Sequence, residues 1–200
     1  MLIKILFLSQ TLEAIVKFFG KIGAWLSIPL IFIIIFDIIT RRFFILGSTK
    51  IQEMEWHLHT AIFLLSLGFA YVKNSHVRIE IIRERYSNNL KSIFEIIGIL
   101  FFLVPYTFII IFYGLDFVSR SYNLNEVSSA LTGLSHRWII KSFIPFGMLL
   151  LFLAGLSILL KNISYLMVQA QKDKQNLALF FKRSEEHTSE LQSLTNLVCR

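Results

Sequence analysis

Apolar residues along this chain of 200 residues fall in long blocks, which short polar and basic stretches separate. An α-helix of about 20 apolar residues crosses the roughly 30 Å hydrocarbon core of a bilayer. Four blocks reach about that length, and they cover residues 22–40, 55–72, 93–113 and 138–160. The pattern predicts an all-α integral membrane protein with four transmembrane helices. Pro105 falls near the middle of the third block and predicts a kink there.

The segment ahead of the first block, residues 1–21, begins apolar and then becomes amphipathic. Four apolar residues share one helical stripe, and the charged residues lie off it: Leu12, Ile15, Val16 and Phe19 against Glu13, Lys17 and Lys21. A signal peptide is the rival interpretation, but the segment has no small-x-small cleavage site and leads into a stronger apolar block. We expect an amphipathic interfacial helix on the cytoplasmic leaflet, followed by a transmembrane domain over residues 22–166.

The polar C-terminal part of the chain divides into two segments. Residues 167–182 are basic and form a predicted cytoplasmic tail. From Arg183 the composition changes abruptly, and the residues from Arg183 to Ser193 match the translation of a common sequencing-library adapter. We therefore expect residues 183–200 to be an adapter-derived artefact and exclude them from fold reasoning, with a natural polar tail as the alternative.

The composition agrees with a membrane protein and narrows the functional classes. Hydrophobic residues make up 55% of the chain and charged residues only 16%, against about 25% charged in an ordinary soluble domain. The net charge of +7 does not indicate nucleic-acid binding, because the basic residues cluster between apolar blocks, as topology signals and lipid-headgroup contacts do. Cys199 is the only cysteine, which excludes an intramolecular disulfide.

The distribution of lysine and arginine predicts how the chain crosses the membrane. If the N-terminus is cytoplasmic, twelve of the basic residues up to Lys182 lie on the cytoplasmic side and six on the periplasmic side. Cytoplasmic segments carry the excess of positive charge. We therefore expect a multi-pass protein of the bacterial inner membrane with both termini in the cytoplasm.

Few polar side chains fall inside the predicted spans, and none forms a recognisable catalytic motif. Glu53 and His57 lie four residues apart on one helical face, a spacing that can bind a cation but more commonly reflects hydrogen bonding near the membrane interface. Asp37 lies about one turn from the end of the first span and four residues before Arg41, which indicates an ion pair at the membrane surface. We expect no catalytic, cofactor-binding or metal site, and therefore no enzyme.

Three short motifs occur in sequence around the first two spans. They are Asp37-x-x-x-Arg41-Arg42-Phe43, then Gln52-Glu53-Met54-Glu55-Trp56-His57-Leu58, then His76-Val77-Arg78-Ile79-Glu80. Together they resemble the DctQ-like small membrane subunit of TRAP (tripartite ATP-independent periplasmic) transporters, over roughly residues 22–166. The segment from Arg137 through Pro145 to Lys161 also resembles the branch of that family named for mannitol and chloroaromatic compounds.

The resemblance implies a division of labour among three proteins. A periplasmic solute-binding protein captures the solute, usually an organic acid, and a large membrane subunit carries it across, driven by a sodium or proton gradient. The small subunit scaffolds the large one and supports docking of the binding protein. Its implied partner-interface or structural residues are Asp37, Arg41, Arg42, Glu53, Glu55, Trp56, His76 and Arg78.

A free-standing four-helix membrane protein, such as a redox anchor or a regulatory subunit, is the alternative. Haem ligation needs histidines well inside facing spans. His57 and His59 lie near a predicted membrane surface, and His76 and His136 lie in predicted loops, so the sequence disfavours this alternative.

Overall fold

The computed structural model describes residues 2–44, 48–73, 86–130 and 133–198, and over residues 177–198 it describes the backbone alone. All regular structure in these ranges is helical, which confirms the predicted all-α class. The elements are α1 (Leu2–Trp25), α2 (Ser27–Phe44), α3 (Thr49–Val72), α5 (Asn88–Gly98), the π-helical turn η1 (Ile99–Leu103), α6 (Val104–Asn123) and α7 (Trp138–Val198).

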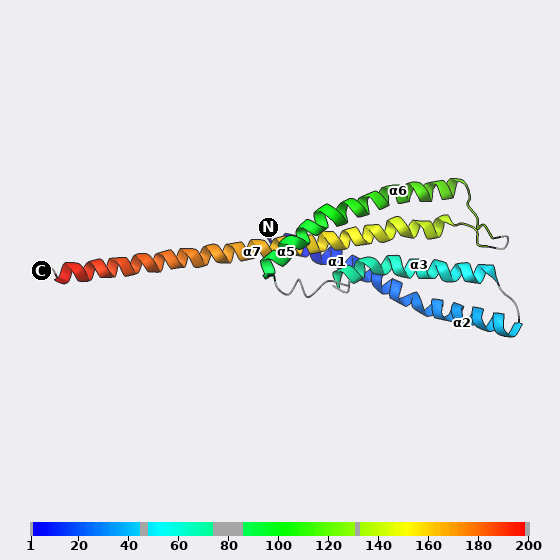
Figure 1. Cartoon of the computed structure of the whole chain (residues 1–200), viewed down its shortest axis with the longest axis horizontal. Coiled ribbons are helices and arrows are strands. Elements are labelled where there is room, and N and C mark those ends of the chain that lie inside the picture. The colour runs from blue at the N-terminus through cyan, green and yellow to red at the C-terminus, as the bar shows by residue number, and fades with distance from the viewer. Residues whose placement is uncertain (1, 45–47, 74–85, 131–132, 199–200) are drawn as a thin grey trace.

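The helices run along one long axis, as Figure 1 shows. We call the end where α2 finishes and α7 begins the loop end, and the opposite end, where α1 begins, the tail end. The N-terminus lies at the tail end, and α7 leaves the bundle there and continues far beyond it (Figure 1). The chain therefore returns to the end at which it starts, as both predicted cytoplasmic termini require.

Three stretches of the described chain are long and apolar enough to cross a membrane: Leu2–Phe44, Asn88–Asn123 and Trp138–Asn176. They contain the first, third and fourth predicted spans. The second predicted span lies in α3, whose 24 residues rise about 36 Å but begin with polar side chains. α3 packs against both α1 and α7, and a helix enclosed by neighbours carries polar groups at lower cost than one that faces lipid. That α3 is a fourth span stays a prediction.

The first helical break lies at Leu26, four residues later than the predicted start of a span at Ile22. Pro29 explains the shift, because it has no N–H to donate to the carbonyl of Trp25 and it is tolerated in the first turn of α2. α1 is also more than a surface helix: it packs on α3 and α7, and the Ser157 hydroxyl of α7 donates to the Ser9 carbonyl at 2.8 Å. The interfacial position of residues 1–21 stays a prediction.

Where a kink is predicted at Pro105, the structure has the π-helical turn η1, which ends two residues before the proline. Pro105 removes the N–H that would pair with the carbonyl of Phe101 in a regular α-helix. A wider turn of this kind is one of the few ways to keep a helix continuous around such a gap. Residues 88–123 therefore form one distorted pass rather than two helices.

The backbone of α7 remains helical through 61 residues, to Val198. It includes the predicted tail, residues 167–182, and the adapter-like segment, residues 183–200, of which it covers all but the last two. A helical backbone does not distinguish a natural tail from a translated adapter, so the origin of the adapter-like segment stays a prediction.

Glycines let the helix backbones approach closely where α3 meets its neighbours. A methyl group added at Gly68 of α3 would lie 2.8 Å from the Leu150 carbonyl oxygen of α7, and one added at Gly147 of α7 would lie 2.9 Å from the Leu64 carbonyl oxygen of α3. Small residues have this role in membrane helix packing, because no hydrophobic driving force acts between helices within lipid. The buried side chains of Leu64, Met148 and Leu151 form the core beside this contact.

We predict that Gly147→Ala destabilises the bundle by about 1–3 kcal/mol, because the added methyl meets backbone that has to move. Gly98→Ala is the matched control, since nothing lies within 4 Å of its added methyl. Thermal unfolding in detergent, followed by retention of the monodisperse peak, measures the difference. A Gly147→Ala protein as stable as the control contradicts the close approach of α3 and α7.

Candidate functional site

The side chain of Glu53, in the second turn of α3, holds the connection between α6 and α7. One carboxylate oxygen accepts a hydrogen bond from the Ser128 hydroxyl. The other accepts one from the Leu134 backbone N–H at 2.6 Å. These partners follow Glu53 by 75 and 81 residues, so a single carboxylate ties two distant parts of the chain together at the loop end.

The connection itself folds back on its own backbone. The Ser128 N–H donates to the Leu134 carbonyl at 3.1 Å, and the Arg137 N–H donates to the Glu126 carbonyl at 3.2 Å. The Glu126 carboxylate pairs with the Lys141 ammonium of α7, which also lies 3.9 Å from the centre of the Phe117 ring. The described residues of this connection therefore bond to α3 through Glu53 and to α7 through Lys141.

A second set of contacts joins α2 to α3 at the same end. Arg41 Nε lies 2.7 Å from the Asp37 carboxylate one turn earlier on α2. With its amide oxygen turned toward α2, Gln52 of α3 accepts from Arg41 Nη1 at 2.9 Å. Asp37 is only 6% exposed, and among the described residues its second oxygen has no hydrogen-bond partner. The predicted ion pair between Asp37 and Arg41 is confirmed, and Arg41 also joins α2 to Gln52 of α3.

Hydrogen bonds lower the pKa of two carboxyl groups at the loop end, those of Glu53 and Glu126. The Leu134 N–H, followed by the Ser128 hydroxyl, keeps the pKa of Glu53 below its usual range. The hydrogen bond from Lys141 likewise lowers the pKa of Glu126. A carboxyl whose pKa is lower in the folded state stabilises that state above its unfolded pKa, and this contribution is lost as the pH falls through the folded value.

The structure joins some of the predicted site residues and leaves others apart. Glu53 bonds to the α6–α7 connection, and Asp37 and Arg41 form the contacts at the end of α2. We call these contacts the two sets of ties. Arg42 and Trp56 are exposed, and one oxygen of Glu55 is buried and has no partner among the described residues. The two remaining predicted residues lie outside the described residues: His76 and Arg78.

Glu53 and His57, the pair whose spacing can bind a cation, each form a hydrogen bond with another partner. His57 Nδ1 bonds to the backbone carbonyl of Glu53, while the Glu53 carboxylate points to the α6–α7 connection. In the parts of the chain that the structure describes, no three histidine, cysteine or acidic side chains are grouped for a metal ion. The hydrogen bond of His57 is thus one within the helix, to the backbone four residues earlier.

Sequence reasoning found Asp37 as a partner of Arg41 but missed Gln52 as the second one, and it missed both partners of Glu53. Ser128 carries no pattern that separates it from other polar residues in loops, and the motif that contains Gln52 does not indicate its partner. The pair of Glu126 and Lys141 was weakly indicated by the sequence, because these opposite charges lie on the two sides of the connection between α6 and α7. These contacts depend on how the helices align with one another after packing, and the spacing of residues within one helix does not predict that alignment.

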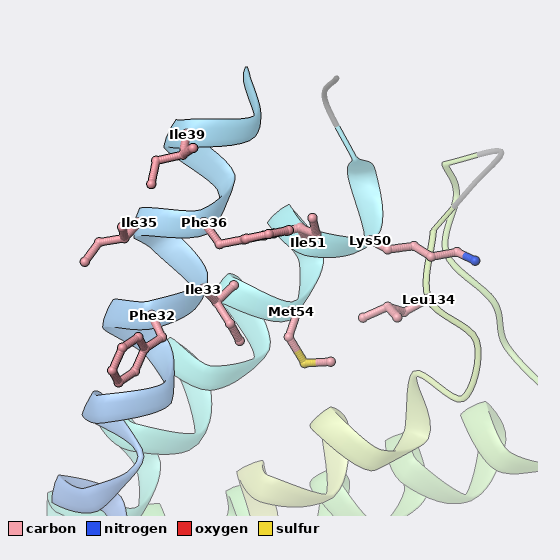
Figure 2. Close-up of a pocket in the computed structure, with 9 residues that line it drawn as sticks. All are labelled: Phe32, Ile33, Ile35, Phe36, Ile39, Lys50, Ile51, Met54 and Leu134. Carbon is pink, nitrogen blue, oxygen red and sulfur yellow. The ribbon is translucent and has the colours of Figure 1, made fainter. Parts of the chain in front are cut away.

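An apolar groove lies between α2 and α3 beside these ties (Figure 2). Its volume is about 620 Å³, and the side chains that line it come from α2, α3 and the α6–α7 connection: Phe32, Ile33, Ile35, Phe36, Ile39, Lys50, Ile51, Met54 and Leu134. Eight of the nine are hydrophobic. Such a lining suits hydrocarbon rather than a polar solute.

The fold and this end of the bundle define the class: a polytopic membrane protein whose polar groups at the loop end are used to hold its own connections together. The family of tripartite ATP-independent periplasmic transporters, DctQ component, matches residues 30–164, and the chain belongs to this family. A comparison with curated proteins finds no match. The branch named for mannitol and chloroaromatic compounds stays a prediction.

Membership makes the chain the small permease component of a TRAP transporter and points away from enzymatic activity. The matched range begins in α2 and ends in the part of α7 that packs within the bundle. It includes both sets of ties and the whole groove. The features described above therefore lie in the part of the chain that the family shares.

We predict that Glu53→Gln raises the hydrogen-exchange rate of the Leu134 amide by about tenfold, because an amide is a weaker acceptor than a carboxylate. Asp116→Asn is the control at the same end, since its pair with Arg120 at 3.4 Å is exposed. Unchanged Leu134 protection in Glu53→Gln contradicts the anchoring role. In the unaltered protein, protection relative to neighbouring amides persists below the usual pKa range of glutamate and is lost at still lower pH.

Proposed function

We propose that this small permease component acts as a scaffold, with its loop end facing the periplasm and supporting the docked solute-binding protein while its apolar faces hold the large membrane subunit. The observation that carries the proposal is how polar and apolar surfaces are divided. Polar side chains at the loop end join α3 to the α6–α7 connection and α2 to α3. Large apolar side chains cover the exposed face of α2, among them Ile28, Ile31, Phe32, Phe36 and Phe43.

The absence of a polar-lined cavity among the pockets described supports a scaffold over an autonomous carrier. The described pockets are lined almost entirely by apolar side chains, and none offers a set of converging donors for an organic acid. The resemblance assigns solute capture to the binding protein and translocation to the large subunit. A sodium or proton gradient as the driving force follows from the resemblance alone.

A free-standing redox anchor is the weaker candidate. His57 is occupied by a backbone carbonyl, and His136 sits at a positive φ of 63° in the α6–α7 connection, away from the middle of any helix. Neither histidine is available to face another across a span.

The proposal places both termini in the cytoplasm, and reporter fusions test this orientation. We expect fusions after Lys50 and after Asn125 to give periplasmic activity, because both sites belong to the loop end, and a fusion after Arg85 to give cytoplasmic activity. The twelve-to-six distribution of basic residues supports this assignment. Cytoplasmic activity at Lys50 would reverse the orientation and, with it, the proposed docking face.

We predict that Glu53→Ala lowers solute uptake several-fold in a reconstituted three-component system. The change leaves the Leu134 N–H and the Ser128 hydroxyl without their acceptor. The α6–α7 connection, which belongs to the proposed docking face, then loses its bonds to α3. Asp116→Ala serves as the matched control, because it removes a carboxylate from the same end without releasing the connection. Binding of solute by the isolated binding protein should be the same with every variant.

From the sequence motif, Arg78→Ala should also lower uptake, since we propose that His76 and Arg78 fix the turn between the second and third spans. If Glu53→Ala and Arg78→Ala both leave uptake and co-purification with the large subunit intact, the scaffold proposal fails. Altered solute specificity would replace it with direct contact between this subunit and the solute.

A further inference from the structure

Glu13 of α1 is shared between two lysines toward the tail end of the bundle. One of its carboxylate oxygens lies 2.5 Å from the Lys17 ammonium, one turn later on α1. The other oxygen accepts a hydrogen bond from the Lys161 ammonium of α7. The Glu13 side chain is only 15% exposed, whereas that of Lys161 is 42% exposed. A single carboxylate therefore joins α1 to α7 and also forms a pair within α1.

A hydrogen bond between the same two helices lies one turn closer to the start of α1. The Ser157 hydroxyl of α7 donates to the Ser9 carbonyl at 2.8 Å, and both serines are fully buried. Ser9 precedes Glu13 by four residues, and Ser157 precedes Lys161 by four, so the two contacts lie on one face of each helix. We call these two contacts, Ser9–Ser157 and Glu13–Lys161, the α1–α7 latch.

Farther along α1, close apolar packing holds the helix against α3. A methyl group added at Gly20 would lie 2.4 Å from Phe69 Cβ, and one added at Gly23 would lie 3.1 Å from Leu65 Cβ. The Val16 side chain beside them is fully buried. These contacts have no substitute within α1, because separating this half of the helix from α3 would leave a void.

The polar groups of the latch, in contrast, have other partners within their own helices. Without Lys161, Glu13 keeps its pair with Lys17. Without α1, the Ser157 hydroxyl can donate to the carbonyl four residues earlier on α7, as serine does in many helices. The exposed Lys161 can extend its ammonium into water or the headgroup region. Opening the latch therefore leaves no buried donor or acceptor unpaired, and such groups are the main cost of breaking polar contacts.

We propose that the α1–α7 latch opens and closes reversibly, and that Lys17 holds the Glu13 carboxylate while the first half of α1 tilts away from α7. The closed state is the packed arrangement described above. In the open state, the exposed apolar side chains at the start of α1, among them Ile3 and Phe7, take the membrane-surface position that the sequence predicts. The two lysines compete for one carboxylate, and their balance sets the closed fraction. This inference depends neither on the scaffold role nor on the orientation of the termini.

Distances between two spin labels test the latch in the full chain, reconstituted in lipid nanodiscs. The labels replace the exposed Phe7 of α1 and the exposed Met167 of α7, after Cys199→Ser removes the single cysteine. We expect a short distance for the closed state and a longer one for the open state. Lys161→Met and Glu13→Gln should each raise the ratio of open to closed molecules by about fivefold, the upper effect of a partly exposed ion pair.

Lys17→Met distinguishes a reversible latch from a fixed contact. It is compared in the Ser157→Ala background, which removes one contact of the latch and populates the open state. Loss of Lys17 leaves the Glu13 carboxylate unpaired only in the open state, so the ratio of open to closed molecules should fall by about fivefold. A fixed contact that both lysines support predicts a change of the opposite sign.

Asp116→Asn is the control, because it alters an exposed pair at the other end of the bundle and should leave the ratio unchanged. Helical content and elution volume show that each variant folds. The inference is overturned if Lys161→Met shows no longer distance, or if Lys17→Met raises the ratio or leaves it unchanged. It is also overturned if Asp116→Asn changes the ratio as much as Lys161→Met does.

Discussion

The close approach of α3 to α1 and α7 is the constraint on which the rest of the structure depends. α3 begins with Lys50, Gln52, Glu53 and Glu55, so its first turns are too polar to face hydrocarbon. Gly68 and Gly147 allow backbone contact with α7, and Gly23 allows α1 to approach the Leu65 side chain. α3 thus packs between α1 and α7, and Glu53 in its second turn bonds to the α6–α7 connection.

Enclosing α3 determines what remains on the outside. α2 contacts mainly α3 and only slightly α1, so most of its large apolar side chains face away from the protein. Its one buried carboxylate, that of Asp37, is neutralised by Arg41 on the same helix. The outer helix is therefore suited to lipid or to another membrane subunit, while the polar contacts that fix its position are confined to its last turns.

The sequence predicted the parts of this arrangement that depend on local pattern. The apolar blocks predicted the helices, Pro105 predicted the distortion of the third pass, and the spacing of Asp37 and Arg41 predicted their pair. It did not predict the break at Leu26 or the partners of Glu53. Ser128 and Leu134 become neighbours of Glu53 only after α3, α6 and α7 have packed, and helical periodicity contains no information about that register.

Leu134 links the two features of the loop end. Its backbone N–H donates to Glu53, and its side chain forms part of the wall of the groove between α2 and α3. A movement of Leu134 therefore changes both its hydrogen bond to the Glu53 carboxylate and the shape of the groove. One residue thus joins the α6–α7 connection to α3 through its amide and to the surface between α2 and α3 through its side chain.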